Sequence, residues 1–286
     1  MEEVEIKTAR WRTVCLPADG GRIKSLTYAG RDLLTREPAD FKAPTEDYGL
    51  YETRPVYGYD DCFPSVEPCV YPGRNINIPD HGELCWLPWQ VEKDGNNLVC
   101  STKSSLLPVT FTRRLDFNEN SLSWHFDINN EGDRELPLLH VMHGLMPLND
   151  ISAIELPDCR QVWDESNRDL ANVDSGSVGK YLLGLQPPSV RMLFLYQIEA
   201  GKIKLHFRKG PELRVEFDKS LFPTLGIWWN NSAYPDEDGC RRTECAFEPI
   251  PGPDSNLADC HKKGEFLLVE PGRSLKWSVK WSILED

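Results

Sequence analysis

The feature that most constrains the fold is a strict alternation of apolar and polar residues in several long segments. The last of them, SLKWSVKWSIL at residues 274–284, places an apolar side chain at every second position. The same period of two runs through VTFTRRLDF (109–117) and SLSWHFDIN (121–129). Because successive side chains of a strand point to opposite faces, each segment predicts a strand with one buried and one solvated face.

The composition agrees with a fold built from many such strands. Aromatic residues are plentiful, and 22 Pro and 20 Gly are spread along the chain, as is typical of short strands joined by turns. Helix signals are scarce, and one short helical turn is expected in VWDESNRDLANV (162–173). We therefore predict an all-β fold, a large antiparallel sandwich, formed by a single domain that spans residues 1–286.

The charge and the cysteines limit the partners and the compartment. A formal net charge of −13 argues against binding to nucleic acid or to anionic membranes. The opening MEEVEIKTARWR lacks the apolar core of a signal peptide, and no apolar run is long enough to span a bilayer. The chain has nine Cys, an odd number, so we expect reduced thiols in a cytoplasmic protein. The sequence does not define an oligomeric state.

A zinc site is one alternative for some of these cysteines. Cys62, Cys69 and Cys85 can be grouped with His81, but their spacing fits no familiar zinc pattern. The simpler interpretation of each cysteine is a small buried hydrophobic residue. We therefore expect no bound metal.

Two long segments, residues 36–80 and 229–244, resist assignment to strands and are rich in Pro, Asp, Tyr and Gly. Loops of this length in a compact domain are commonly functional. The first contains Asp61 and Arg74, and it is followed at once by His81 and Trp86.

Other ionisable side chains lie in apolar surroundings. His140 and His143 belong to LPLLHVMHGLMPL, which is apolar on both faces and predicts a central strand. Being three positions apart, they should point to opposite faces, so at most one faces a given cleft. Glu248 follows the apolar run 245–247, and the prolines that come next predict that the strand ends there. An imidazole and a carboxylate on opposite sides of a small substrate can move two protons in concert.

Three motifs resemble elements of the aldose 1-epimerases (galactose mutarotases), in the same order along the chain. They are HGELCW (81–86), LHVMHGLM (139–146) and AFEPIPGPDSNLAD (246–259). The opening LPADGGRIKSLTYAGRDLL and the closing LVEPGRSLKWSVKW are also similar to that family, so the resemblance spans nearly the whole chain. It implies a galactose mutarotase-like β-supersandwich with a sugar bound in an open cleft on one sheet.

The resemblance also implies roles for three residues. Glu248 matches the general base that takes the proton of the sugar's C1 hydroxyl, and His143 matches the acid that protonates the ring oxygen. His81 matches a second histidine that hydrogen-bonds the ring oxygen or a neighbouring hydroxyl. The ring opens and recloses with the other configuration at C1, without a metal, nucleotide or redox cofactor. For these roles Glu248 needs only its ordinary pKa, and His143 a slightly raised pKa.

The expected ligand is a small-molecule sugar, a free aldose. Trp86 and Trp228 are candidates for packing on its apolar face, although a single Trp is more often a core residue. Asp61, Arg74 and Arg113 are candidates for contacts with its hydroxyls. Two alternatives stay open. One is a hexose-6-phosphate mutarotase with basic residues from FTRR and FRKG, which the net charge disfavours; the other is a non-catalytic carbohydrate-binding protein on the same fold.

Overall fold

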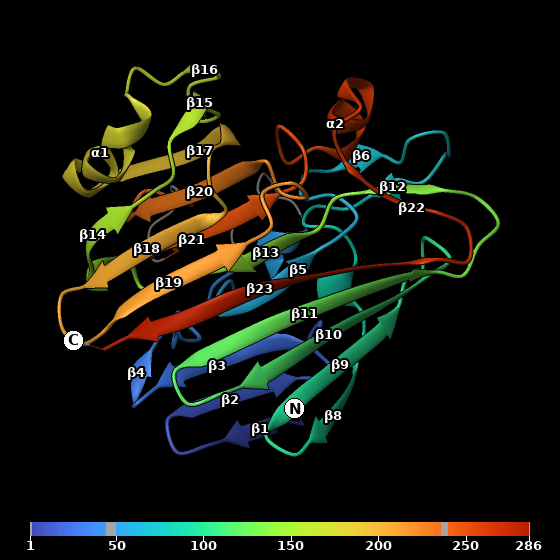
Figure 1. The fold of residues 1–286 in the computed structure, drawn as a ribbon, viewed down its shortest axis with the longest axis horizontal. Helices are drawn as coiled ribbons and strands as arrows, with labels where there is room; N and C mark the ends of the chain where they lie inside the picture. The colour runs from blue at the N-terminus through green and yellow to red at the C-terminus, as the bar shows by residue number, and fades with distance from the viewer. Residues whose placement is uncertain (1, 44–49, 236–239, 286) are drawn as a thin grey trace.

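The structure, a computed structural model, describes residues 2–43, 50–235 and 240–285. Its largest element is an eight-stranded sheet that crosses the front of Figure 1. In spatial order its strands are β14 (Ile151–Glu155), β18 (Lys202–Phe207), β19 (Glu212–Phe217), β23 (Ser274–Leu284), β11 (Ser121–Asn130), β10 (Val109–Phe117), β9 (Asn97–Lys103) and β8 (Gln90–Asp94).

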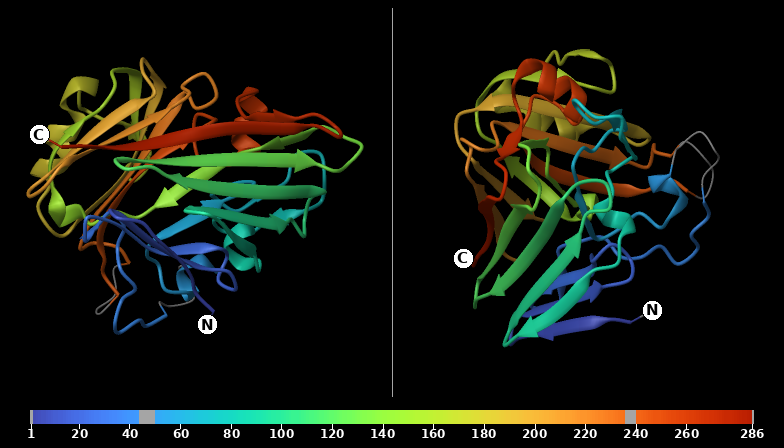
Figure 2. Two further views of the ribbon diagram at one scale, coloured as in Figure 1. Left: turned by 60° about the horizontal axis from the view of Figure 1, so that its bottom comes forward. Right: turned by 90° about the vertical axis from the view of Figure 1, so that its right-hand side faces the viewer.

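Two further sheets pack behind this long sheet. One contains β1 (Val4–Lys7), β2 (Trp11–Leu16), β3 (Arg22–Tyr28), β5 (Tyr59–Cys62) and β13 (Val141–Gly144), with β4 (Arg31–Asp32) paired to β3. The other contains β16 (Asp169–Leu170), β15 (Cys159–Asp164), β17 (Ser189–Ile198), β20 (Thr224–Asn231) and β21 (Thr243–Ile250). Figure 2 separates the N-terminal strands from the long sheet above them.

The remaining elements are short. Two strand pairs are formed by β12 (Leu136–Leu138) with β22 (Leu267–Val269) and by β6 (Cys69–Val70) with β7 (Asn77–Ile78). The helices are α1 (Val178–Gly184) and α2 (Leu257–Lys263), with 3-10 turns at Tyr51–Thr53, Leu84–Trp86, Leu148–Asp150 and Ser175–Ser177. Both helices lie at the periphery in Figure 1. None of the helices in the described ranges is long and apolar enough to cross a membrane.

The alternating segments form the strands that their period predicts. In β23 the side chains of Trp277, Val279 and Trp281 are buried, and the intervening Ser278 and Lys280 are exposed. The register pairs Trp124 of β11 with Val279, so the aromatic rows of neighbouring strands meet on one face. Tyr59 of β5 packs on Trp124 from the sheet behind, with ring centroids 4.6 Å apart. The prediction of an all-β fold, a large antiparallel sandwich, is confirmed.

Three local predictions were wrong. The segment 162–173 is a hairpin of β15 and β16, not a helical turn. The histidine-containing run is not one central strand, because β12 pairs with β22 whereas β13 pairs with β5, and His140 lies in the break between them. The third correction concerns Glu248: β21 continues through Pro249 to Ile250. This strand is at the edge of its sheet, where a proline needs no ladder partner for the missing N–H.

Candidate active site

Segments that are far apart in the sequence meet at a cavity of about 490 Å³. β21 contributes Glu248, β13 contributes His143, and the loop before the 3-10 turn at Leu84–Trp86 contributes His81. Trp228 of β20 also lines the cavity. The structure thus brings four of the predicted site residues together at one concave surface, the usual form of a small-molecule site.

Glu248 is held in β21 opposite Gly226 of β20. A Cβ at position 226 would lie 2.7 Å from Ile250 Cδ1 and 3.4 Å from Glu248 Oε2, so the glycine makes room for the carboxyl group. Glu248 is only 5% exposed, and burial raises its pKa to about 8. The raised pKa favours the protonated carboxyl group at neutral pH, whereas the role expected from the sequence is that of an ionised base.

His81 is presented by an unusual backbone. His81 and Gly82 both have left-handed φ angles, 58° and 70°. The turn bridges to Phe63, and a Cβ at position 82 would overlap the Phe63 carbonyl oxygen. Only glycine fits there, which explains the His-Gly pair of the sequence. The ring is oriented by Asp80, whose Oδ1 lies 3.0 Å from His81 Nδ1.

His143 lies on β13 beside β5, where it is paired with Asp60. Its Nδ1 is 3.0 Å from the hydroxyl of Tyr51, and that hydroxyl donates to Asp60 Oδ2 at 3.0 Å. Since the hydroxyl has one proton and gives it to Asp60, it must accept from Nδ1–H of His143. The Nε2 atom then carries a lone pair. Burial, together with the neighbouring His81, holds the pKa of His143 well below its usual range, so the ring is neutral.

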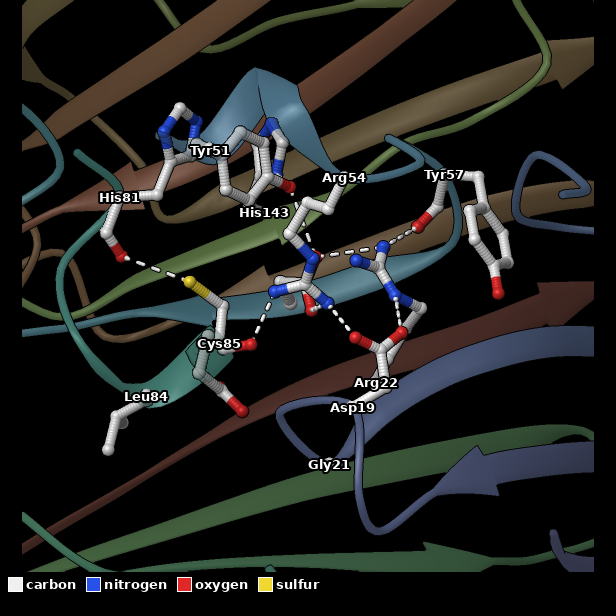
Figure 3. Close-up of polar contacts among 12 residues, drawn as sticks. Asp19, Gly21, Arg22, Tyr51, Arg54, Tyr57, His81, Leu84, Cys85 and His143 are labelled. Atoms are coloured by element: carbon white, nitrogen blue, oxygen red, sulfur yellow. Dashed lines mark hydrogen bonds and ion pairs between the residues drawn. The ribbon is translucent and has the colours of Figure 1, made fainter. Parts of the chain in front are cut away.

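A buried ion-pair network supports Tyr51 from behind. Arg22 Nη1 is 2.9 Å from Asp60 Oδ2, and Asp19 accepts from both Arg22 and Arg54, at 2.8 and 2.5 Å. Figure 3 shows Tyr51 against His81, with the two arginines joined through Asp19. The Tyr51 and His81 rings stack with centroids 3.6 Å apart. Tyr51 therefore contacts both histidines and fixes their relative position.

The structure places four of the predicted contact residues outside the cavity. Asp61 and Arg113 are fully buried and form an ion pair with each other, and Asp61 Oδ1 also bonds His140 Nε2 at 2.9 Å. They lie in the core and are not among the residues that line the cavity. Arg74 packs on Tyr71, and the 41% exposed Trp86 lies beside Arg54. Neither is among the residues that line the cavity.

Sequence reasoning missed several lining residues. Tyr51 and Glu52 come from the long segment 36–80, whose length was the only signal. Arg242 lies in the second long segment and bridges Glu52 and Glu244, with a closest distance of 2.8 Å to each. This triad spans residues almost 200 positions apart, and nothing in the local sequence predicts it. Parts of both long segments, residues 44–49 and 236–239, lie outside the described residues.

Comparison with solved structures identifies the fold. A candidate aldose 1-epimerase from Escherichia coli K12 matches with a TM-score of 0.74 and 14% identity, over 100% of this chain and 99% of that one. A galactose mutarotase-like protein from Lactobacillus casei ATCC 334 matches with a TM-score of 0.68 and 13% identity, over 99% and 100%.

A galactose mutarotase related enzyme from Lactobacillus acidophilus matches with a TM-score of 0.62 and 16% identity, over 99% and 97%. No protein-family model and no curated protein sequence matches this chain. The three structures extend over essentially the full length of the sandwich described above. The chain therefore has the galactose mutarotase-like fold.

Proposed function

We propose that the protein is an aldose 1-epimerase-like isomerase, which interconverts the α and β anomers of a free sugar by acid–base ring opening. The observation that carries the proposal is the convergence of Glu248, His81 and His143 on one cavity within this fold. These residues come from three different parts of the chain. A site of this kind needs only one acid and one base beside the sugar.

The proton count of the free protein suits this reaction. Ring opening needs one group to give a proton to the ring oxygen while another takes the proton of the C1 hydroxyl. At neutral pH the pair holds one transferable proton, and the raised pKa of Glu248 together with the lowered pKa of His143 assigns it to Glu248. We therefore reverse the roles expected from the sequence: Glu248 is the acid and His143 Nε2 is the base in ring opening.

The steps balance without any further reactant. Glu248 protonates the ring oxygen, the C1–O5 bond breaks, and its electron pair stays on that oxygen. His143 takes the C1 hydroxyl proton as the carbonyl forms. After rotation about C1–C2, His143 returns its proton to the carbonyl oxygen and Glu248 takes the proton of the O5 hydroxyl as the ring closes on the other face. His81, with its ring oriented by Asp80, hydrogen-bonds the sugar.

The charge of the lining favours a neutral sugar over a sugar phosphate. Besides the histidines, one basic residue lines the described part of the cavity, Arg242, and it is already paired with Glu52 and Glu244. Apart from the protonated Glu248, the acidic lining residues are Glu52, Glu67, Asp80 and Glu244. A phosphate group would meet net repulsion there.

The arginines of the two basic segments considered for a phosphate are engaged elsewhere. Arg113 is buried with Asp61, and Arg114 pairs with Asp94 and Asp116. In the second segment, Arg208 donates to the carbonyl of Asn149. The hexose-6-phosphate alternative is therefore without support from these residues.

The test is exchange between the α and β anomers of a panel of free aldoses, measured by NMR saturation transfer. Acceleration by the protein, and its loss in Glu248→Gln, is the expected result. Sugar binding without acceleration would make the protein a non-catalytic carbohydrate-binding protein on the same fold.

A further inference from the structure

We propose that Cys62, His81 and His143 form a transition-metal site at the floor of the cavity. The ligand atoms of these three residues, the Cys62 sulfur and one ring nitrogen from each histidine, all lie within 4.8 Å of one another. Ligand atoms of a tetrahedral zinc site are about 3.3–3.8 Å apart, as follows from metal–ligand bonds of 2.0–2.3 Å. Small movements of the three side chains would therefore bring the donor atoms to the spacing that one ion requires.

The surroundings of both histidines resemble those of metal ligands. His81 Nδ1 is bonded to Asp80 Oδ1, and His143 Nδ1 to the Tyr51 hydroxyl, which is in turn bonded to Asp60. Metal-ligating histidines typically use one ring nitrogen for such a partner, which fixes the ring and directs the other nitrogen to the ion. Within the described residues, no hydrogen bond uses Nε2 of either ring.

The donor set selects the class of ion. One thiolate and two imidazoles suit Zn²⁺ and other soft or borderline ions, whereas Mg²⁺ and Ca²⁺ prefer oxygen donors. Cys62 is fully buried and coordinates as a thiolate, so binding releases its proton to the solvent. The two histidines line the cavity, which leaves a fourth position open to a ligand from that side. Neither Cys69 nor Cys85, which were grouped with His81 in the sequence, belongs to this cluster.

A metal bound here would occupy the lone pair of His143 Nε2, so that this atom could no longer accept a proton. This consequence rests on the proposed isomerase function, whereas the site itself does not. Zn²⁺ should therefore inhibit anomer exchange, and a chelator should restore it. Cys62 does not line the cavity, so Cys62→Ser should retain exchange and lose its sensitivity to Zn²⁺.

The direct test is titration of the full chain with Co²⁺ in the presence of a phosphine reductant. Binding should produce a thiolate-to-cobalt charge-transfer band that saturates at one ion per chain and is displaced by Zn²⁺. The band should vanish in Cys62→Ser. It should survive in Cys245→Ser, which removes a thiol that is equally buried but outside the cluster.

A second variant tests the site without changing Cys62, so its result does not depend on whether Cys62→Ser folds. Asp80→Asn leaves the three ligands in place and removes the carboxylate that orients His81, so the Co²⁺ affinity should fall by about 10–100-fold. The absence of a band in the wild-type protein, or a band that persists in Cys62→Ser, would overturn the proposal. Because the band is read without a sugar, it also decides the metal site if anomer exchange itself is not found.

Discussion

Replacing Glu248 by Gln should stabilise the protein at neutral pH while abolishing exchange. Burial raises the folded pKa of Glu248 from its ordinary value of 4.5 to about 8. Between these two values the unfolded chain has lost the proton and the folded chain has kept it. The stability of the wild type therefore falls as pH rises, by about 1.4 kcal/mol per pH unit.

The size of this stability difference follows from the number of pH units between the ordinary pKa of 4.5 and pH 7. From 4.5 to 7 is about 2.5 pH units, so the buried carboxyl costs about 3 kcal/mol at pH 7. Gln does not titrate and its amide faces the same cavity, so Glu248→Gln should recover about that amount at pH 7 and nothing near pH 4.5. A gain in stability when a catalytic group is removed is typical of active sites, where activity and stability often conflict.

The assay is urea unfolding of the wild type and the variant at several pH values between 4.5 and 8. Glu244→Gln is the matched control, because Glu244 lies on the same strand and is paired with Arg242 at 2.8 Å. That change should lower stability, by about 1.5–3 kcal/mol for a hydrogen bond to a charged group. A Glu248→Gln variant that is less stable than the wild type at pH 7, or a gain that does not depend on pH, would refute the reasoning.

Three further predictions concern the same region. His143→Asn should slow exchange by about 10²–10⁴-fold with an unchanged melting temperature. His140→Asn should retain exchange and lose about 1–3 kcal/mol of unfolding free energy. The opposite pattern would place the cleft on the other side of β13. Exchange should decline above pH 8 as Glu248 loses its proton, so a rate still rising at pH 9 would contradict its role as the acid. Arg113→Met should lower the free energy of unfolding by about 3–5 kcal/mol, because it removes the ion-pair partner of the buried Asp61 carboxylate. Arg114→Met, on the exposed face, should lower it by about 0–1 kcal/mol. Equal losses would show that Arg113 is not buried with Asp61.

The strands were predictable from the sequence where one face is buried and the other is wet. In β10, β11 and β23 the alternation reflects that environment: the burial follows it throughout β10 and β11, and as far as Trp281 in β23. The run around His140 and His143 is buried on all sides, so the sequence could not indicate that it divides between two sheets. Pro249 was misread because the rule against prolines applies to central strands, and sequence alone does not say which strand is at an edge.

The candidate site was predictable only in part, for a related reason. Motifs identified Glu248, His81 and His143, but protonation depends on burial and on neighbours that approach through the fold. Tyr51 and Asp60 determine the tautomer of His143, and their partnership with it appears only when β5 lies beside β13. Arg113 occupies a buried position in the alternation of β10, and the sequence did not indicate that the buried Asp61 is the partner of its charge.

The measurement that tests the central claim most directly is the rate of α–β anomer exchange, by NMR saturation transfer, for wild-type protein and Glu248→Gln at pH 7. The account predicts that the wild type accelerates exchange of at least one free aldose, and that the variant is folded and slower by about 10²–10⁴-fold. Equal rates in the two proteins, or a wild type that binds the sugar without accelerating exchange, would contradict the assignment of this cavity as a mutarotase active site.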